Sequence, residues 1–389
     1  MKVVILAAGK GTRMLPLTET RPKPMLKVVN KIILEHNLEQ LDGLVEEVIL
    51  VVGYLGDKIK NYFGNKFKNL KIRYVEQREQ RGTGHALMMA KDKLEDDFLV
   101  LGGDDLYFRE DIKKVLNKRL CILVKEIPNP ECFGVVDTKG RKVIELVEKP
   151  KNPKGNLVNT SLYHLNKEVF EIELKETERG EFELTDYIKG ILPIDFVIAE
   201  NWFPLTYPWN LLEVNEFLIS KVEGNEILGK VEKNVYIGEK VKIGEGTIVK
   251  SGSYIEGKVI IGKNCKIGPN CYIRGSTSIG DGCHIGAGVE IKNSIFFENC
   301  NAPHLNYVGD SIVGSNSNLS AGTITANLRH DGKSIKVMVK GKLVDSKRRK
   351  LGAIIGDNVK LGIGTLIYPG RKISSNQTTL PGEIIRKNK

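Results

Sequence analysis

Long apolar runs are missing from this sequence of 389 residues. A membrane-spanning helix needs about 18 to 20 consecutive apolar residues, and no segment of the chain approaches that length. The short apolar stretch at the N-terminus leads directly into Gly9-Lys10-Gly11 without a small-residue cleavage site, so we interpret it as the first strand of a domain and not as a signal peptide. The sequence therefore favours a cytoplasmic protein with no membrane partner.

Cysteines and aromatic residues are also few. The six cysteines form no Cys-x-x-Cys pair and have no histidine at zinc-binding spacing, so we expect reduced, buried thiols. Aromatic residues make up 7% of the chain, and the basic residues behind the net charge of +11 are dispersed. With no nucleic-acid-binding motif present, we expect no nucleic-acid partner, and the charge suits a basic enzyme that acts on small polyanions.

The length favours two domains, and the pattern of apolar residues changes near Gly224. Over residues 1–223, apolar runs alternate with helical patterns. This alternation predicts an α/β domain with a mostly parallel sheet, covered by helices on both faces, that binds ligands beyond the carboxyl ends of its strands. Strands are expected at 2–8, 48–53, 72–76 and 98–102, and helices at 33–41, 57–63, 84–94 and 208–222.

Over residues 224–389 aliphatic residues recur at every sixth position. This period predicts a parallel β-helix, in which each hexad forms one side of a triangular coil and the aliphatic side chain points inward. The repeat is interrupted at 301–306 and again across 328–350, where functional loops are expected. The aliphatic positions are Ile237, Ile243, Val249, Ile255, Ile261, Ile267, Ile273, Ile279, Ile285, Ile291, Ile355, Leu361, Ile367 and Ile373.

Most corners after the aliphatic position are glycine, but three that follow one another by one coil are not. Glu256, Arg274 and Lys292 are spaced by 18 residues, one full coil, so they should stack on one edge about 4.8 Å apart. Adjacent cations repel each other unless an anion lies between or over them. We therefore expect a phosphate site at Arg274 and Lys292, with a solvated surface strip, partly compensated by Glu256, as the alternative.

The strongest local motif is Leu6-Ala7-Ala8-Gly9-Lys10-Gly11-Thr12-Arg13, followed by Arg21-Pro22-Lys23-Pro24. Its spacing is not that of a P-loop. Two glycines after a strand let backbone N–H groups surround a triphosphate, and Arg13 and Lys23 can neutralise the charge that builds on the α-phosphate and pyrophosphate. The pattern resembles the nucleoside-triphosphate transferases that make sugar nucleotides. The resemblance implies that Leu6, Ala8 and Gly9 contact the nucleotide.

The resemblance extends along the first half of the chain. The segment Gln77-x-x-Gln80-x-Gly82-Thr83 is similar to the uracil-binding loop of the uridylyltransferases, which implies nucleotide contacts for Gln77, Gly82 and Thr83. The Gly103-Asp104 pair matches the family's Mg²⁺-binding aspartate. The remaining matches imply a sugar-phosphate site made of Gly134, Glu148, Lys149 and Asn159.

One segment departs from the family pattern. Archaeal relatives carry Trp-x-Asp-x-Gly-x-Pro-Trp, in which the aspartate is a second metal ligand, but here Pro204 stands at that position. Asn210, six residues later, could supply the oxygen instead. The alternatives are that the site binds metal weakly or that the nucleotidyl-transfer activity has been lost.

The second half of the chain resembles the acetyltransferase domain of the bifunctional UDP-N-acetylglucosamine pyrophosphorylase/glucosamine-1-phosphate acetyltransferases of the GlmU type. This resemblance covers nearly the whole chain and is most specific over 267–327. It implies a left-handed coil and a homotrimer with the active site between subunits. It further implies His304 as general base, the Ala321 N–H as oxyanion donor in the acetyl-CoA site, and sugar-phosphate contacts from Arg274, Lys292, Tyr307, Asn318 and Asn327.

A cluster of basic residues lies on the second interruption, at Lys333, Lys336 and the run 347–350. These residues could bind coenzyme A phosphates or the sugar phosphate, or could simply be solvated. The sequence leaves the three roles open.

Three functions are compatible with these patterns. The first is a bifunctional enzyme that acetylates glucosamine-1-phosphate with acetyl-CoA and then transfers uridylyl from UTP to the product with Mg²⁺. The second is nucleotidyl transfer alone, from UTP or dTTP to glucose-1-phosphate, with the β-helix as an oligomerisation or regulatory module. The third is a nucleotide-sugar sensor. The set of His304, Tyr307 and Asn327 favours the first, because a scaffold needs none of them.

Overall fold

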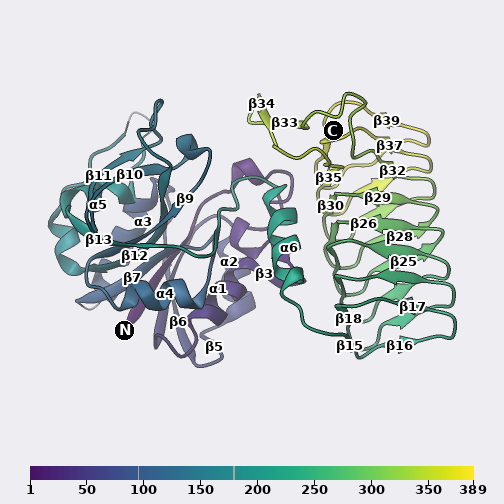
Figure 1. Ribbon diagram of the computed structural model, residues 1–389, viewed down its shortest axis with the longest axis horizontal. Coiled ribbons are helices and arrows are strands. Elements are labelled where there is room, and N and C mark those ends of the chain that lie inside the picture. The colour runs from purple at the N-terminus through teal and green to yellow at the C-terminus, as the bar shows by residue number, and fades with distance from the viewer. Residues whose placement is uncertain (95, 178–179) are drawn as a thin grey trace. The chain divides into compact units, whose positions relative to one another are not determined.

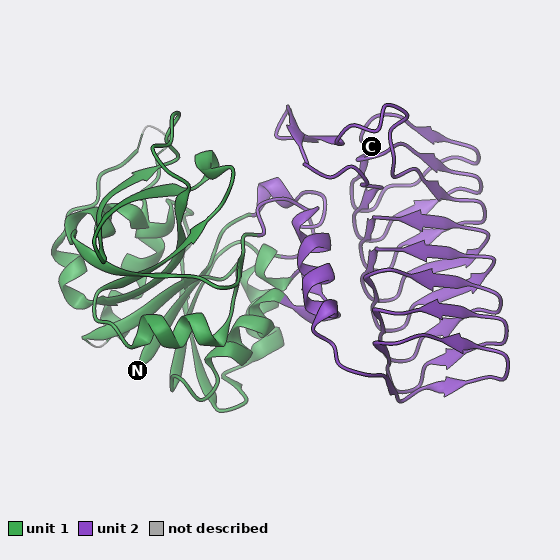
Figure 2. Cartoon of the chain, viewed as in Figure 1, with its two compact units in different colours: residues 1–10, 22–25, 33–204 green, residues 11–21, 26–32, 205–389 purple. Residues whose placement is uncertain are grey.

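A computed structural model describes residues 1–94, 96–177 and 180–389 of the chain. These residues form two compact units, one of residues 1–10, 22–25 and 33–204 and the other of 11–21, 26–32 and 205–389 (Figure 2). The division differs from the expected boundary at residue 223. Helix α6 (Asn210–Ser220) belongs with the second unit, where the Asn215 side chain donates to the Ser276 carbonyl and accepts from the Ser278 hydroxyl.

The first unit contains one mixed sheet, which in the described residues has ten strands in the order β10-β11-β13-β9-β12-β7-β1-β4-β6-β5 (Figure 1). Its parallel centre matches the predicted strands: β1 (Lys2–Ala7), β4 (Glu47–Val52), β6 (Leu70–Glu76) and β7 (Asp97–Gly102). The expectation of a mostly parallel sheet holds only there. Beyond β7, strands follow one another without a covering helix between most of them, so antiparallel pairing becomes possible. These strands are β9 (Cys121–Glu126), β10 (Gly134–Lys139), β11 (Lys142–Glu148), β12 (Leu157–Asn166) and β13 (Ile194–Ile198).

The expected helices form with small shifts at their ends. They are α1 (Ile33–Leu41), α2 (Gly56–Phe63) and α3 (Thr83–Met89), the last being shorter than predicted because a 3₁₀ turn, Lys91–Lys93, replaces its final turn. Two further helices, α4 (Arg109–Leu116) and α5 (Leu184–Gly190), complete the unit. Short strands pair at its margins and in the segments counted with the second unit: β2 (Lys27–Val28), β3 (Lys31–Ile32), β5 (Lys66–Phe67), β8 (Leu106–Tyr107) and β14 (Trp202–Phe203).

The second unit contains the predicted left-handed parallel β-helix, whose strands stack as successive rungs in Figure 1. Side one consists of β15 (Glu226–Ile227), β18 (Val241–Ile243), β21 (Val259–Ile261), β24 (Thr277–Ile279), β27 (Ile295–Phe296), β30 (Ile312–Val313), β35 (Ile354–Ile355) and β38 (Lys372–Ile373). Side two consists of β16 (Lys230–Val231), β19 (Ile248–Val249), β22 (Lys266–Ile267), β25 (His284–Ala287), β28 (Asn301–His304), β31 (Asn318–Leu319) and β36 (Lys360–Leu361). Side three consists of β17 (Tyr236–Ile237), β20 (Tyr254–Glu256), β23 (Tyr272–Arg274), β26 (Glu290–Lys292), β29 (Tyr307–Gly309), β32 (Ile324–Thr325), β37 (Leu366–Ile367) and β39 (Ile384–Ile385).

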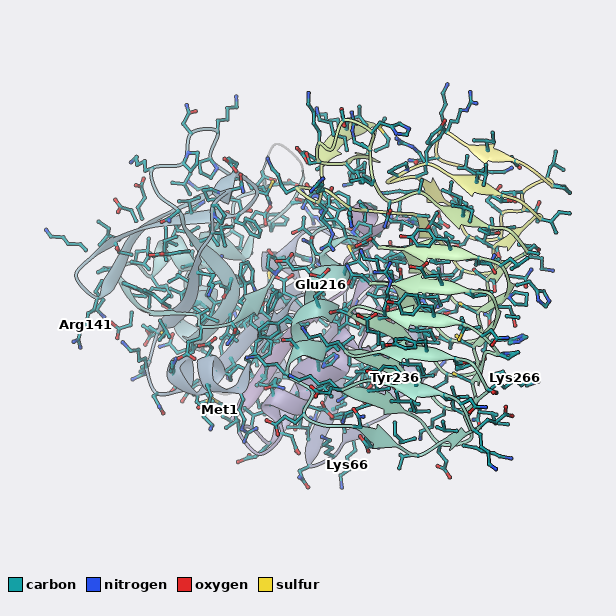
Figure 3. The ribbon with its side chains drawn as sticks, turned by 45° about the vertical axis from the view of Figure 1, so that its right-hand side comes forward. Met1, Lys66, Arg141, Glu216, Tyr236 and Lys266 are labelled. Carbon is teal, nitrogen blue, oxygen red and sulfur yellow. The ribbon has the colours of Figure 1, made fainter. Side chains whose placement is uncertain are left out.

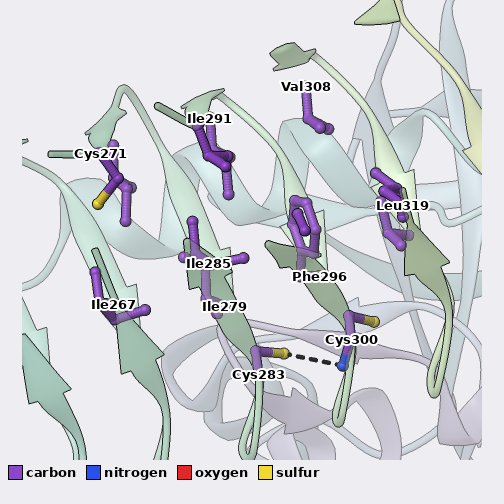
Figure 4. Close-up of a cluster of buried hydrophobic side chains, with 14 of the residues drawn as sticks. Ile267, Cys271, Ile279, Cys283, Ile285, Ile291, Phe296, Cys300, Val308 and Leu319 are labelled. Carbon is purple, nitrogen blue, oxygen red and sulfur yellow. Dashed lines mark hydrogen bonds between the residues drawn. The ribbon is translucent and has the colours of Figure 1, made fainter. Parts of the chain in front are cut away.

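The predicted aliphatic ladder fills the interior of the β-helix. Ile267 and Ile285 are adjacent in register and fully buried, and their side chains point inward together with those of neighbouring coils (Figure 4). The cysteines at 265, 283 and 300 lie in the same core, where the Cys300 N–H donates to the Cys283 sulfur. All six cysteines are free, and five are buried as expected, whereas Cys132 is exposed.

The first predicted interruption of the repeat is not an insertion. Arg274 pairs with Lys292, 18 residues later, but Ser278 pairs with Ile295, 17 residues later, so one residue is missing from the corner after Lys292. The chain stays in the coil, and the inward positions shift to Phe296, Ala302, Val308, Val313 and Leu319. The pattern at 301–306 therefore marks a change of phase, which a fixed six-residue count cannot follow.

The second interruption is a true insertion. Ile312 pairs with Ile354 across the excursion, which contains a hairpin of β33 (Lys336–Val339) and β34 (Lys342–Asp345). Among the described residues, no helix has the length and apolar character that crossing a membrane requires.

Candidate active sites

The nucleotide-binding segment begins where β1 ends. The Gly103 N–H donates to the Leu6 carbonyl, so the loop after β7 lies beside the loop after β1. A Cβ atom on Gly9 would meet no other atom within 4 Å, and this glycine therefore faces open space that a ligand could enter. Gly11 adopts a left-handed conformation (φ 61°) that starts the 3₁₀ turn Thr12–Met14, on which Arg13 is exposed.

Asp104 and Lys23, predicted from separate motifs, lie together in the first unit. The Lys23 Nζ is 2.7 Å from Asp104 Oδ2 and 4.0 Å from Asp105 Oδ1. The lysine side chain is only 10% exposed, whereas that of Asp104 is 44% exposed and accessible to a ligand. The arrangement places a cation and a carboxylate at the edge where β1 and β7 end.

The chemistry of Asp104 fits a magnesium ion. In the described part of the chain, no group of three or more His, Cys, Asp or Glu residues is placed to hold a metal. Mg²⁺ is commonly held by one or two carboxylates together with substrate phosphates, so a single exposed carboxylate is a suitable protein ligand.

The predicted base-recognition residues are held by their own loop. Gln77 is almost fully buried, and its amide donates to the Gly82 carbonyl and contacts His85 Nδ1, both at 3.0 Å. Gly82 has a φ of 96°, and a Cβ there would lie 2.4 Å from the Phe182 carbonyl oxygen, so only glycine fits. The Thr83 hydroxyl accepts from the Leu184 N–H. The loop is thus rigidly connected to the segment before α5.

The predicted sugar-phosphate residues also meet. Gly134 pairs with Glu148 in register, and a Cβ on this glycine would lie 3.1 Å from the Glu148 carboxylate. Lys149 forms an ion pair with the same carboxylate at 2.6 Å. The Asn159 side chain accepts from the Ser161 N–H and donates to the Tyr163 hydroxyl.

Tyr107 is a supporting residue that the sequence did not indicate. Its hydroxyl donates to the Thr160 carbonyl at 2.7 Å and accepts from the Gly102 N–H, so it ties the end of β7 to the strand that carries Asn159. Burial raises the pKa of Tyr107 well above its ordinary value and keeps the hydroxyl protonated. No motif distinguishes this tyrosine from an ordinary core residue.

Asn210, predicted as a substitute metal ligand, begins α6. Its amide oxygen accepts from the Tyr207 N–H at 2.8 Å, and its amide nitrogen is 3.5 Å from a Glu213 carboxylate oxygen. This oxygen therefore already caps a turn. A metal would have to use its second lone pair, and the role stays a prediction.

The stacking of Arg274 and Lys292 is confirmed, because the two residues are register partners on β23 and β26. Both cations, however, already have carboxylate partners. Arg274 donates twice to Glu290 Oε1, at 3.0 and 2.7 Å, and Lys292 pairs with Asp310 at 3.0 Å. The repulsion that suggested a phosphate site is thus relieved within the chain.

Asp310 organises the corner between sides three and one. It is 2% exposed and accepts from Lys292, Asn293 and Asn327. The Asn327 amide also lies 3.2 Å from the Tyr307 hydroxyl. Two predicted sugar-phosphate residues, Lys292 and Asn327, thus bind one buried carboxylate that the hexad rule did not single out, and Tyr307 joins them through Asn327.

The remaining acetyl-transfer residues lie at the opposite end of side three, at the corner between sides two and three. His304 ends β28 and is exposed, and its carbonyl accepts from the Gly322 N–H. Asn318 donates to the Ser320 hydroxyl, next to Ala321. Burial and the nearby charges of Lys266 and His304 lower the pKa of His284. Within one chain, His304 and the Arg274–Lys292 pair occupy different corners.

Arg348, in the predicted basic run, is committed to an ion pair. Its guanidinium donates to Glu216 on α6 at 2.6 Å, and the same Glu216 oxygen accepts from Asn293; Figure 3 labels Glu216. Arg348 therefore fastens the inserted hairpin to α6. The other basic residues of the insertion remain candidates for ligand binding.

Comparison with family models gives two matches. Residues 2–195 match the nucleotidyl transferase family, and residues 255–379 match a family described as the GMPPB C-terminal domain. A structure from Bacillus anthracis described as a glucose-1-phosphate thymidylyltransferase is similar to the chain, with a TM-score of 0.51 and 27% identity; the match covers 56% of this chain and 94% of that one.

Full-length relatives extend the similarity to both units. A bifunctional protein GlmU from Methanocaldococcus jannaschii is 46% identical over 97% of this chain and 92% of its own length. A bifunctional sugar-1-phosphate nucleotidylyltransferase/acetyltransferase from Sulfurisphaera tokodaii is 39% identical over 100% of this chain and 98% of its own.

Proposed function

The chain belongs to the GlmU family of bifunctional nucleotidylyltransferases and acetyltransferases, and we propose that it makes UDP-N-acetylglucosamine in two steps. The β-helix acetylates glucosamine-1-phosphate with acetyl-CoA. The α/β unit then transfers uridylyl from UTP to the N-acetylglucosamine-1-phosphate. Substrates of this kind are cytoplasmic metabolites, and we assign the protein to that compartment.

In the acetylation, the sugar amine attacks the thioester carbonyl of acetyl-CoA. The new C–N bond forms, the C–S bond breaks, and coenzyme A leaves as the thiol. His304 takes the proton from the amine, a task for which imidazole is the side chain used most often. The Ala321 N–H donates to the developing oxyanion. Arg274 and Lys292 bind the sugar phosphate, assisted by Tyr307, Asn318 and Asn327.

In the uridylyl transfer, a phosphate oxygen of the sugar phosphate attacks the α-phosphorus of UTP. The new P–O bond forms, the bond to the β-phosphate breaks, and pyrophosphate leaves. Arg13 and Lys23 neutralise the charge on the phosphates, while the glycine-rich loop supplies backbone N–H groups. Gln77, Gly82 and Thr83 select the base, and Gly134, Glu148, Lys149 and Asn159 hold the sugar phosphate.

Asp104 is the protein ligand for Mg²⁺ in this proposal, with Asn210 as a second candidate. When bound, the ion would offset the negative charge of the triphosphate. Lys23 and Asp104 already form an ion pair at this edge. Binding of the metal by Asp104 and of the triphosphate by Lys23 would replace that ion pair.

We further propose a homotrimer formed through side three of the β-helix. Several outward residues of this side are large, apolar or aromatic, and accessible: Tyr236, Tyr254, Ile324, Leu366 and Ile384 are 36–49% exposed. The two groups of acetyl-transfer residues lie at opposite ends of the same side. Packing side three of one subunit against the next would let His304 of one chain approach the cation pair of another.

The observation that carries the proposal is the 2.7 Å pair of Lys23 and Asp104, because two distant motifs meet where the nucleotide loop begins. The test is pyrophosphate release from UTP and N-acetylglucosamine-1-phosphate. Asp104→Ala should reduce this activity by at least about 100-fold, the upper range for weakening a metal site. Acetylation should be unchanged, since the acetyl-transfer residues lie in the other unit.

Asp92→Ala, an exposed carboxylate in the 3₁₀ turn after α3, is the matched control and should retain both activities. Equal loss of both activities in a folded Asp104→Ala protein would contradict the assignment of uridylyl transfer and acetylation to separate units. Pyrophosphate release with glucose-1-phosphate but no acetylation by the wild-type protein would instead support nucleotidyl transfer alone.

A further inference from the structure

Arg21, the first residue of the Arg-Pro-Lys-Pro motif, is bound by residues of the β-helix. The Arg21 guanidinium donates to the Ser315 hydroxyl at 2.6 Å and to Asp357 Oδ2 at 2.8 Å, and it lies 3.5 Å from Glu298 Oε1. It also stacks over the Phe297 ring at 5.0 Å. The Arg21 side chain is only 13% exposed, so this is a built contact and not a surface encounter.

The β-helix residues that make these contacts form one column at the corner between sides one and two. Glu298, Ser315, Asp357 and Ser375 occupy equivalent positions in successive coils: the Ser315 N–H donates to Asp357, and the Asp357 N–H donates to Ser375. We call these four residues the corner column. Glu298 and Asp357 supply two carboxylates to a surface that faces a basic segment.

The segment of residues 19–30 follows this column coil by coil. Glu19 accepts from the Ser375 N–H at 2.6 Å, and Thr20 donates to Asp357. Lys27 pairs with Glu298 at 3.0 Å, and the Asn30 amide donates to the Ile279 carbonyl at 2.7 Å. The contacts thus run in order from the last coils towards the middle of the β-helix, and they span the signature residues on both sides of Lys23.

These contacts bear on nucleotidyl transfer because Lys23 follows Arg21 by two residues and Arg13 precedes it by eight. A loop that carries catalytic cations must be ordered before they can act, and fixing each free residue costs backbone entropy. Ordering the loop in advance therefore lowers the barrier of the chemical step.

We propose that Asp357 and Glu298 are positioning residues for uridylyl transfer: the corner column holds Arg21 and thereby keeps the loop that carries Arg13 ready for the triphosphate. The inference rests on the proposed uridylyl transfer at that loop.

Asp357→Asn is the decisive variant. Asp357 uses Oδ1 to accept the Ser315 N–H within the coil and Oδ2 to bind the signature segment. An asparagine can retain the first bond, but its amide N–H₂ would then face the Arg21 guanidinium. Asp281→Asn is the matched control, because Asp281 Oδ1 makes the same corner bond to the Lys263 N–H in a lower coil and its side chain is exposed.

For full-length Asp357→Asn we expect kcat for pyrophosphate release to fall about 10- to 100-fold, as for a slightly misplaced catalytic group. The KM for N-acetylglucosamine-1-phosphate, the acetylation rate and the melting temperature should stay within about 2-fold or a few degrees of wild type. Asp281→Asn should match wild type in every measurement. Arg21→Met combined with Asp357→Asn should be no slower than Arg21→Met alone, since both changes break the same contact.

Each other outcome counts against the proposal. Wild-type kcat in Asp357→Asn would show that the loop needs no anchor, while the uridylyl-transfer assignment would stand. Parallel losses of acetylation and melting temperature would make Asp357 a structural residue of the coil. Additive losses of kcat in the double variant would show that Asp357 acts independently of Arg21. If the wild-type protein itself releases no pyrophosphate, the proposed function fails and this inference fails with it.

Discussion

At the scale of single residues, the cations expected to bind phosphate are already paired with carboxylates. Arg274 and Glu290 are each about one-third exposed, so water screens their ion pair and a ligand can reach it. In the proposed acetyl-transfer site, a sugar phosphate would compete with Glu290 for the guanidinium. We therefore expect Glu290 to oppose substrate binding, an effect that the sequence did not suggest.

Neutralising Glu290 should strengthen substrate binding. Glu290→Gln should lower the KM for glucosamine-1-phosphate severalfold with little change in kcat, because the phosphate lies away from the reacting amine and contributes mainly uniform binding. Arg274→Ala should raise the same KM. Steady-state acetylation with glucosamine-1-phosphate and with glucosamine as comparison substrate checks both. An unchanged phosphate preference in both variants would remove this corner from the substrate site.

His304 should affect the chemical step instead. Removing a general base costs about 10²–10⁴ in rate, so His304→Ala should lower kcat for acetylation by that factor at neutral pH. The loss should shrink as the pH rises and the free amine becomes abundant. Kinetics from pH 6 to about 9.5 test this, and a loss that stays constant over the range would argue for a binding role.

Glu298 should make stability depend on pH. Burial alone would raise the pKa of this carboxyl, but Lys27 and Arg21 outweigh it and lower the pKa from 4.5 to about 2. A carboxyl whose pKa is depressed by folding stabilises the protein above its unfolded pKa, and this contribution is lost as the pH falls from about 4.5 towards 2. Urea midpoints at several pH values should show a shallower decline in Glu298→Gln than in wild type, and equal slopes would refute the ion pair.

At the scale of elements, the β-helix depends on an unbroken inward ladder. Ile285 is fully buried between Ile267 and Ala302, its register partners in the adjacent coils. A cavity there has no flexible neighbour to fill it, because the backbone on either side is fixed by strand pairing. Each coil therefore has little capacity to relax around a deleted side chain.

Ile285→Ala should destabilise the β-helix by about 2–5 kcal/mol, the usual cost of truncating a buried isoleucine. Ile248→Ala on the outer face of side two, where the side chain is 37% exposed, is the comparison and should cost less than about 1 kcal/mol. Denaturant unfolding of both variants measures the difference. A small cost at Ile285 would indicate that the coil repacks more readily than its pairing suggests.

At the scale of the whole molecule, the positions of His304 and Arg274 at opposite corners of side three lead to a prediction about how subunits share the acetyl-transfer site. If His304 from one chain works with Arg274 from its neighbour, two impaired variants should complement each other when glucosamine-1-phosphate is kept well below the raised KM of Arg274→Ala. Refolding equal amounts of His304→Ala and Arg274→Ala chains should restore about one quarter of wild-type acetylation, because that fraction of mixed interfaces carries both native residues.

The control is each variant refolded alone, which at the same low substrate concentration should stay well below the activity of the mixture. Recovery fails if both residues act within one chain, so the absence of complementation in a mixed trimer would place the site inside a single subunit. Size-exclusion chromatography with light scattering establishes that the refolded species are trimers.

Much of the first site could be predicted because its motifs are local. The loop after β1 and the Gly103-Asp104 pair each follow a strand, and parallel strands end at one edge, so their meeting follows from the fold class. The side chains that contact the predicted site residues could not be predicted. Tyr107, Asp310 and Glu290 are ordinary residues until folding places a hydroxyl or carboxylate against a specific group.

The sequence by itself determined the periodic features of this protein: the strand–helix alternation, the six-residue ladder and the stacking of Arg274 on Lys292. Periodicity is a local property, since each residue's direction follows from its position in the repeat. Only the tertiary structure decided the phase shift after Lys292, the pairing of both cations and the contact of Arg21 with Asp357. Those features depend on residues 16 to 336 positions apart, and no local rule sets which distant side chains share a surface.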